Sequence, residues 1–131
     1  MYISMNKEKM DSKRIHALLN QTYWASDRTH STVIKSISTS ECVAVYNGGL
    51  IIGFARIVTD YSTVFWICDV VVDPEFRGQG IGKMILNHIK TLEYYKDLKG
   101  ILATKDAHGL YEQYGFQKET EKFMTKSRGV E

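Results

Sequence analysis

Hydrophobic positions in the first third of the chain repeat with the period of an amphipathic helix. Apolar residues recur at three- and four-residue spacing between Ile15 and Leu19, which predicts a helix from Asp11 to about Thr22, capped by Asp11 or Ser12. A weaker pattern of the same kind predicts a second helix from Thr29 to Ser38. The chain is therefore expected to begin with a small helical unit.

The middle of the chain carries longer apolar runs broken by turn residues, which is typical of strands. We expect strands from Cys42 to Tyr46, from Leu50 to Asp60 and from Val64 to Val72. Asn47-Gly48-Gly49 between the first two runs is a strong signal for a tight hairpin. These runs predict an antiparallel meander.

In the rest of the chain, segments with the hydrophobic pattern of a helix alternate with short strand-like apolar runs. We expect a helix from Gly80 to Leu92, a short strand from Ile101 to Ala103 and a short helix from His108 to Tyr114. A strand, helix, strand order implies a parallel crossover. Phe116–Gln117 and Lys122–Thr125 are expected to close the sheet. The predicted fold is α+β, with a mixed sheet flanked by helices.

Length and composition favour one globular domain over residues 1–131. Hydrophobic residues make up 44% of the 131, which is enough for a packed core. The formal net charge is +2, far from the clustered basic surface of a nucleic-acid binder. No apolar run approaches eighteen residues, and the N-terminal segment lacks the apolar core of a signal peptide. We expect no nucleic-acid or membrane partner, a cytoplasmic setting, and only a loose tail from Ser127 to Glu131.

Cysteine and histidine spacing gives no sign of a metal site. Cys42 and Cys68 lie in apolar strand-like runs, and neither CxxC nor HExxH occurs. We interpret both cysteines as buried thiols that act as small hydrophobic residues, with a reactive role for Cys68 left open. No metal is expected.

The most informative stretch runs from Val70 to Lys83, VVVDPEFRGQGIGK. An unbroken apolar strand ends at Asp73, and a glycine-rich turn then leads into the helix expected from Gly80. Glycines let the backbone approach a ligand closely, and the first turn of a helix presents unpaired N–H groups that favour phosphate. Arg77 and Lys83 add positive charge at either side. The stretch predicts a phosphorylated cofactor, although ordinary strand-to-helix turns can carry the same glycine spacing.

Two motifs together give this chain a family resemblance. Arg77-Gly78-Gln79-Gly80-Ile81-Gly82 fits the pattern Arg/Gln-x-x-Gly-x-Gly/Ala between a strand and a helix, and Ala107, Tyr111 and Gly115-Phe116 fit a second pattern further along. With these motifs the chain resembles the GCN5-related N-acetyltransferase (GNAT) superfamily, from about Cys42 to Phe116. The resemblance implies that the strands before and after the cofactor helix splay apart and admit acyl-CoA.

The resemblance further implies transfer of an acetyl group from acetyl-CoA to an amine. Backbone N–H groups of the turn would hold the pyrophosphate, the last valines of the strand would pair with the peptide-like pantetheine, and an N–H near Val70 would stabilise the oxyanion. The implied cofactor-binding residues are Val70, Val71, Val72, Arg77, Gly78, Gln79, Gly80, Ile81, Gly82, Lys83 and Tyr111.

Tyr111 matches the family tyrosine that faces the CoA sulfur. A phenol has a pKa near 10 and a thiol near 8.5, so full proton transfer to the thiolate would be uphill by about 2 kcal/mol. We therefore expect Tyr111 to stabilise the thiolate by a hydrogen bond, with packing alone as the alternative. Tyr114 is expected to pack. Many relatives carry Asn three residues before the alanine, and Thr104 stands there in this chain.

The acceptor side rests on fewer signals. Asp69 interrupts an apolar strand beside the expected reaction centre, where a charge is costly unless paired. It is a candidate for the base that receives the amine proton, or it accepts hydrogen bonds from backbone or Arg56 for structural reasons. Tyr23 and Trp24 lie in a connection and either line the acceptor pocket or seat the loop on the core. Asp60 and Glu41 are weaker candidates for the base.

The sequence thus favours an N-acetyltransferase acting on an amine of a small molecule or peptide, with a homodimer as a possible state. The alternative from another class is a catalytically weak module that binds or senses acyl-CoA. Retention of Tyr111 favours the enzyme. The identity of the acceptor does not follow from the sequence.

Overall fold

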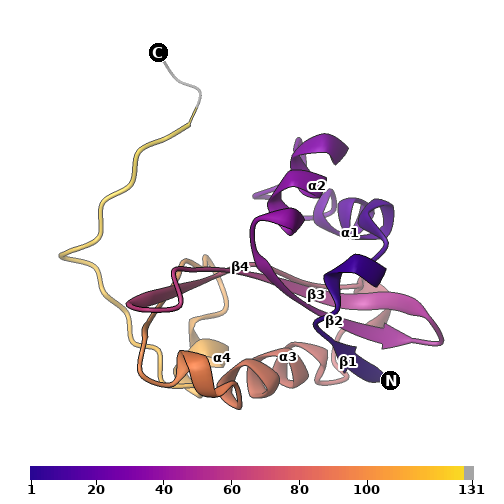
Figure 1. Cartoon of the computed structure of the whole chain (residues 1–131). Coiled ribbons are helices and arrows are strands. Elements are labelled where there is room, and N and C mark those ends of the chain that lie inside the picture. Colours follow the sequence, from indigo (N-terminus) through magenta and orange to yellow (C-terminus); the bar gives the residue numbers. More distant parts are fainter. Residues whose placement is uncertain (129–131) are drawn as a thin grey trace.

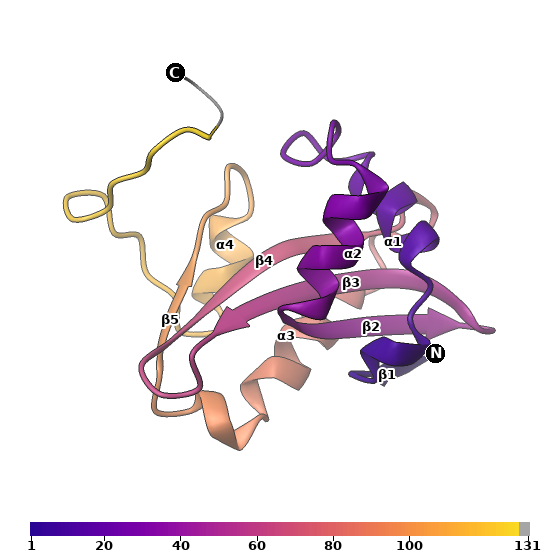
Figure 2. The same ribbon diagram turned by 45° about the horizontal axis from the view of Figure 1, so that its top comes forward.

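The computed structural model describes residues 1–128, which form one five-stranded sheet between two layers of helices (Figure 1). The strands lie side by side in chain order, β1-β2-β3-β4-β5. One layer holds α1 and α2, and the other holds α3 and α4 (Figures 1 and 2). The bounds are β1 Tyr2–Ser4, α1 Ser12–Leu19, α2 His30–Ser38, β2 Glu41–Asn47, β3 Leu50–Thr59, β4 Val64–Val72, α3 Ile81–Lys90, β5 Lys99–Leu102 and α4 His108–Glu112.

The two N-terminal helices begin where the sequence places their caps. The Asp11 carboxylate accepts hydrogen bonds from two backbone N–H groups of α1, and the Thr29 hydroxyl accepts one from α2. Both helices turn their apolar faces to one side of the sheet and build the first core with side chains of β2 and β3. Their predicted ranges are confirmed, except that α1 stops at Leu19.

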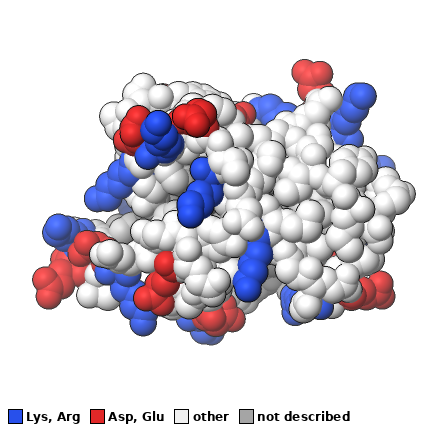
Figure 3. All heavy atoms as spheres, turned by 90° about the horizontal axis from the view of Figure 1, so that it is seen from below, with Lys and Arg blue, Asp and Glu red and all other residues white. Residues whose placement is uncertain are grey.

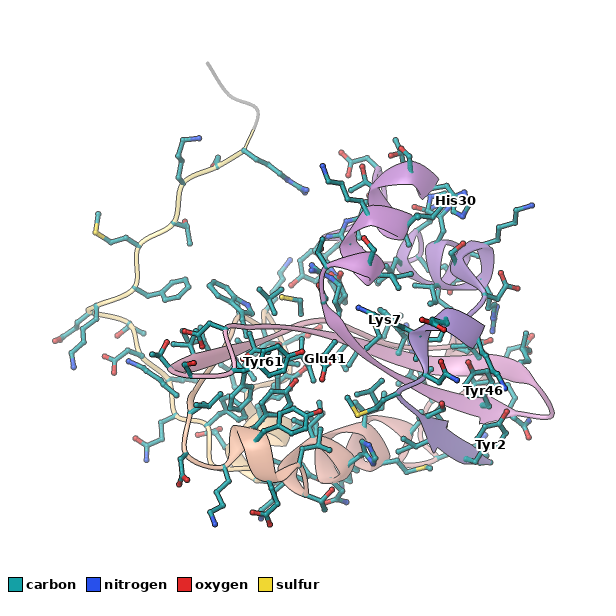
Figure 4. The ribbon with its side chains drawn as sticks, viewed as in Figure 1. Tyr2, Lys7, His30, Glu41, Tyr46 and Tyr61 are labelled. Atoms are coloured by element: carbon teal, nitrogen blue, oxygen red, sulfur yellow. The ribbon has the colours of Figure 1, made fainter. Side chains whose placement is uncertain are left out.

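The meander forms as predicted. β2 and β3 pair antiparallel, and Gly48 and Gly49 connect them with φ of +58° and +86°. Two central residues with positive φ give the twist that a two-residue hairpin needs. β1 was not predicted. It pairs with β2 at the sheet edge, where the ring of Tyr2 stacks on Tyr46 with centroids 4.9 Å apart (Figure 4).

The second core lies between the sheet and α3. Its helix side carries Ile81, Ile85, Leu86 and Ile89, which share one face at helical spacing. Gly53 on β3 allows this close contact, because a Cβ there would meet Cγ2 of Ile81 at 2.6 Å. The start of α3 is thereby pressed against the middle of the sheet.

β4 and β5 separate partway along their length. Their parallel pairing runs from Val64↔Lys99 to Ile67↔Leu102 and stops there, while β4 continues to Val72. The edge of β4 from Cys68 to Val72 is left without a strand on that side among residues 1–128. The predicted mixed sheet, with its meander and parallel crossover, is confirmed.

The sheet does not close where the sequence suggested. Phe116–Gln117 and Lys122–Thr125 were expected to be strands, and neither is one. The segment after α4 instead leaves the body of the molecule (Figures 1 and 2), and Phe123 makes its ring contact with Trp66, centroids 5.8 Å apart. A strand forms only when a neighbouring edge supplies its hydrogen bonds. The Phe116 ring packs on Gly100 of β5, but within residues 1–128 no strand pairs with β5 on that side. Part of the tail predicted from Ser127 to Glu131 falls outside the described residues.

Candidate functional site

The turn between β4 and α3 has the shape of an anion site. Asp73 ends the strand and caps a single 3-10 turn, Pro74–Phe76, by accepting a hydrogen bond from the N–H of Glu75. Gly78 and Gly80 both have φ of +79°, a region that only glycine occupies at no cost. Gly80 is the N-cap of α3, so the N–H groups of the first helical turn face out of the helix end.

Open space surrounds this turn. A Cβ built on Gly78 or Gly80 would meet nothing within 4 Å, and the side chains of Arg77 and Lys83 are exposed. A ligand phosphate can therefore approach backbone N–H groups and two cations together. Figure 3 shows the face on the α3 side, where some lysines and arginines stand among uncharged residues and others lie beside acidic ones.

An arginine on α1 holds the start of this turn, and sequence reasoning missed it. The Arg14 guanidinium donates to the Asp73 carboxylate and, through Nε, to the carbonyl oxygen of Ile51 at 2.8 Å. The pKa of Asp73 is lowered by the hydrogen bond from the N–H of Glu75 and by Arg14. Helical periodicity gave no sign of Arg14, because its partners come from distant strands.

Tyr111 lies on the same side of the sheet as the turn and the exposed edge of β4. It belongs to the second core, against which Val70 and Val72 also pack. α4 lies beside the first turn of α3, since Cδ2 of Leu110 is 3.9 Å from the Cβ position of Gly82. The structure thus brings together the predicted turn, strand edge and tyrosine.

The Tyr111 phenol is 8% exposed. Burial raises its pKa, and the negative charge of Asp106 raises it further. The hydroxyl therefore keeps its proton at neutral pH and can donate a hydrogen bond. Tyr111 also lines a groove of about 610 Å³, together with Thr104 and His108. Thr104, which stands at the family's Asn position, accepts the N–H of Ala107 and so holds the start of α4.

Asp69 sits at a bulge in β4. The pairing with β3 shifts between Phe54↔Val71 and Arg56↔Cys68, which leaves one extra residue in β4. Asp69 has φ of +54°, an uncommon conformation that Asp tolerates better than most residues. The bulge turns Asp69 to the α1–α2 side of the sheet, where its partners lie.

Three donors converge on the Asp69 carboxylate. Trp24 Nε1 donates to Oδ1 at 3.1 Å, while Arg28 Nη1 and Arg56 Nε donate to Oδ2 at 2.7 and 2.8 Å. Burial alone would raise the pKa of Asp69, but the hydrogen bonds and charges of the two arginines outweigh it and hold the pKa below its usual value. A carboxylate engaged in this way is a weak proton acceptor. Its role as the base stays a prediction, and the geometry disfavours it.

The aromatic pair divides between two environments. Trp24 packs against the first core and donates a hydrogen bond to Asp69. It therefore seats the loop on the core, which is one of the two alternatives that the sequence left open. Tyr23 is 62% exposed and packs edge to face against Trp24. Nζ of Lys105 lies over the Tyr23 ring, 5.3 Å from its centroid. The connection before α2 and the loop after β5 therefore meet at Tyr23 and Lys105.

The weaker candidates lie elsewhere. Asp60 accepts hydrogen bonds from Ser62, Thr63 and Val64 in the β3–β4 turn, at the opposite end of β4 from the glycine turn. Glu41 accepts the hydroxyl of Tyr94 at that same end, near Tyr61 (Figure 4). Both carboxylates accept hydrogen bonds there, far from the glycine turn, and their role as the base stays a prediction.

The cysteines are free thiols. Cys42 is buried, and burial raises its pKa to about 11; Cys68 is half-buried, and burial raises its pKa as well. Within residues 1–128 no three histidine, cysteine or acidic side chains are grouped closely enough to hold a metal ion. No helix in this part of the chain is long and apolar enough to span a bilayer.

Sequence comparison places the middle of the chain in one family. Residues 38–118 match the family model for the acetyltransferase (GNAT) domain. The GCN5-related N-acetyltransferase 2, chloroplastic, of Arabidopsis thaliana is 30% identical over 115 residues, 82% of this chain and 44% of that protein. The uncharacterized N-acetyltransferase ycf52 of Gracilaria tenuistipitata var. liui is 40% identical over 68 residues, 50% of this chain and 37% of that protein. The chain spans less than half the length of these two relatives.

Solved structures extend the likeness to the whole fold. A crystal structure of a protein assigned to the GNAT family, from Xanthomonas campestris pv. campestris, is 34% identical with a TM-score of 0.91, covering 96% of this chain and 92% of that one. An aminoglycoside 6'-N-acetyltransferase crystallised with coenzyme A is 21% identical with a TM-score of 0.60, covering 69% of this chain and 53% of that one. The second likeness shows the fold alone.

Proposed function

We propose that this chain, which belongs to the GNAT family of acetyltransferases, moves an acetyl group from acetyl-CoA to an amine. One observation carries the proposal. Within residues 1–128, the edge of β4 at Val70–Val72 has no strand beside it on the β5 side, and Val70, Val72 and Tyr111 pack in the same core, on the side of the sheet where α3 follows the glycine turn. Helix-start N–H groups that suit phosphate, a strand edge that suits a peptide-like arm and a tyrosine hydroxyl together match the chemistry of an acyl-CoA.

Acetyl-CoA would bind along the β4 edge, from the glycine turn toward Tyr111. N–H groups from Gly78 to Lys83 would receive the pyrophosphate, with Arg77 and Lys83 adding charge. The pantetheine amides would pair with the backbone of Val70–Val72 as an added strand, which requires the free edge that the separation of β5 leaves. The fold neighbour crystallised with coenzyme A supports a donor of this class.

The reaction then needs two things from the protein. The amine nitrogen attacks the thioester carbonyl, a C–N bond forms, and the C–S bond breaks with its electron pair going to sulfur. A backbone N–H near Val70 would stabilise the oxyanion, and the Tyr111 hydroxyl would donate a hydrogen bond to the departing thiolate. The amine proton would pass to water, because the Asp69 carboxylate is already engaged by three donors.

The acceptor would approach from the α1–α2 side. Tyr23 is exposed there, and Trp24 and Asp69 form the floor beside the reaction centre. We assign Asp69 a positioning role: it holds Trp24 and Arg28 in place and, through the bulge, sets the direction of the following Val70 N–H. The acceptor is an amine of a small molecule or a peptide.

Thermal unfolding tests donor binding first. Acetyl-CoA at a hundred times its dissociation constant adds about 2.7 kcal/mol of stability, so the melting temperature should rise clearly with millimolar acetyl-CoA and less with ATP or NAD. A larger rise with ATP or NAD would point to another nucleotide class, and no rise with acetyl-CoA would refute the proposal.

Release of free thiol across a panel of amines tests turnover. Amine-dependent release identifies the enzyme. Binding of acetyl-CoA with no release for any amine would instead identify the alternative, a module that senses acyl-CoA.

A further inference from the structure

Two arginines share one carboxylate beside the proposed reaction centre. Arg28 and Arg56 both donate to Oδ2 of Asp69, and within residues 1–128 neither arginine has another acidic partner. The three side chains are at most 16% exposed. Two positive charges and one negative charge leave this cluster with one positive charge in excess. A charge that is largely removed from water is costly unless it is paired, so the cluster favours binding of an anion.

The Arg28 guanidinium has N–H groups available for such an anion. Arg56 donates through Nε to the shared carboxylate and through Nη1 to the Ser40 hydroxyl, whereas Arg28 donates only through Nη1 within residues 1–128. A guanidinium carries five N–H donors in a planar fork that fits a carboxylate with two parallel hydrogen bonds. The backbone of Arg28 is held in place, because its carbonyl oxygen accepts a hydrogen bond from Nε2 of His16 at 2.8 Å. Arg28 is therefore a fixed cation with donors to spare.

The surroundings of this cluster add positive rather than negative charge. Nζ of Lys105 lies over the ring of Tyr23, which packs against Trp24, the third donor to the shared carboxylate. Asp27, the acidic residue of the loop that carries Arg28, is exposed, so solvent and salt screen its charge. A second ammonium group on the acceptor would meet like charges here. The site therefore disfavours polyamines and lysine-rich peptides as acceptors.

We propose that the acceptor is an amino acid, or another short amine that carries a carboxylate, and that Arg28 binds this carboxylate; this rests on the acetyl transfer proposed above. Asp69 directly precedes Val70, which lies beside the expected thioester. A carboxylate held at Arg28 would therefore leave the amine of a short molecule within reach of the thioester carbonyl. In the transfer a C–N bond forms, the C–S bond breaks, and the amine proton passes through water to the CoA thiolate. The products are an N-acetyl amino acid and free CoA.

Matched pairs of amines test the class of acceptor. Each pair is an amino acid and the amine that remains when its carboxylate is removed, such as L-phenylalanine with phenethylamine or β-alanine with ethylamine. Release of CoA thiol from acetyl-CoA gives kcat/KM for each member. A hydrogen bond between charged groups is worth about ten- to hundredfold in binding, so wild type should prefer the amino acid by a factor in that range. Equal or better use of the decarboxylated amine in every pair would overturn the proposal, whereas no transfer to any amine would refute the function on which it rests.

Arg28→Gln separates binding of the carboxylate from a structural role. The variant leaves Asp69 paired with Arg56 as a neutral pair, so the fold should be kept. Its kcat/KM should fall about ten- to hundredfold for the amino acid and stay within about twofold of wild type for the decarboxylated amine. Each amine is compared with itself, so differences in amine basicity cancel.

Two further variants complete this test. Arg28→Lys keeps the charge and should retain part of the preference for the amino acid. Lys13→Gln removes an exposed cation of α1 and should retain all of it. If Arg28→Gln lowers kcat/KM equally for both members of a pair, Arg28 has only a structural role and the proposal is overturned.

Discussion

Replacement of Asp69 by Asn removes one negative charge from a buried cluster and changes little else. The two residues have nearly the same size, and Asn tolerates the positive φ of this position. The variant therefore leaves Arg28 and Arg56 without their counter-ion while sparing the bulge. Its effect reports on the charge pairing.

The size of the effect follows from burial. The side chains of Arg28, Arg56 and Asp69 are 12%, 16% and 3% exposed. Removing one partner of a buried ion pair costs about 3 to 5 kcal/mol, and the lower end applies because the amide oxygen still accepts one hydrogen bond. For a chain of this length, about 3 kcal/mol lowers the melting temperature by about 10 °C.

Urea unfolding at several pH values checks the sign as well as the size. The folded pKa of Asp69 is lowered, so its contribution is present above the unfolded pKa of about 3.9 and is lost as pH falls through the folded pKa. The difference between wild type and Asp69→Asn should be constant from pH 8 to about pH 5 and shrink below pH 4. Asp27→Asn, an exposed charge in the same loop, should change stability little.

The same variant tests the catalytic assignment. If Asp69 only positions its neighbours, Asp69→Asn lowers turnover by a similar factor from pH 6 to pH 9.

The stability test has its own contrary outcome. A free energy of unfolding at pH 7 within about 0.5 kcal/mol of wild type would show that the ion pairs of Asp69 do not stabilise the fold. The turnover test has another. A loss of turnover concentrated at low pH would restore Asp69 as the proton acceptor.

Three further variants probe the other parts of the site. Tyr111→Phe should lower kcat on the order of a hundredfold with little change in acetyl-CoA affinity, whereas Tyr114→Phe should change neither kcat nor affinity. If chemistry is rate-limiting and the turnover of Tyr111→Phe stays within about twofold of wild type, Tyr111 has only a packing role. Gly80→Glu should abolish acetyl-CoA binding measured by calorimetry, while Gly48→Glu, at another glycine of positive φ, should preserve it; wild-type affinity in a folded Gly80→Glu variant would place the phosphates elsewhere. Trp24→Ala should raise the acceptor KM more than the Kd for acetyl-CoA in parallel titrations, and equal losses in both with a lower melting temperature would leave Trp24 only its seating role.

The cofactor side of the molecule could be predicted because its signals are local. The glycine turn, the strand before it and the helix after it are contiguous, and their backbone geometry depends on residues within a few positions. The separation of β4 from β5 entered through the family resemblance. It depends on where two distant strands stop pairing, which no local pattern encodes.

The acceptor side could be predicted only in part, for the same reason. Asp69 was singled out as a charge in an apolar strand, but its partner Arg28 comes from a loop 41 residues away. The bulge that turns Asp69 toward that loop leaves no mark in the alternation of the sequence. The predicted strand at Lys122–Thr125 failed because strand propensity without a paired neighbour does not make a strand.

Direct detection of acetyl transfer tests whether this chain is an acetyltransferase. Purified protein, acetyl-CoA labelled in the acetyl group and a panel of amines would be incubated together, and the products followed by mass spectrometry. We expect the label to move to at least one amine at a rate proportional to enzyme concentration, and Tyr111→Phe to slow this transfer while acetyl-CoA still binds. Tight binding of acetyl-CoA with the label left on the thioester for every amine tested would contradict this expectation.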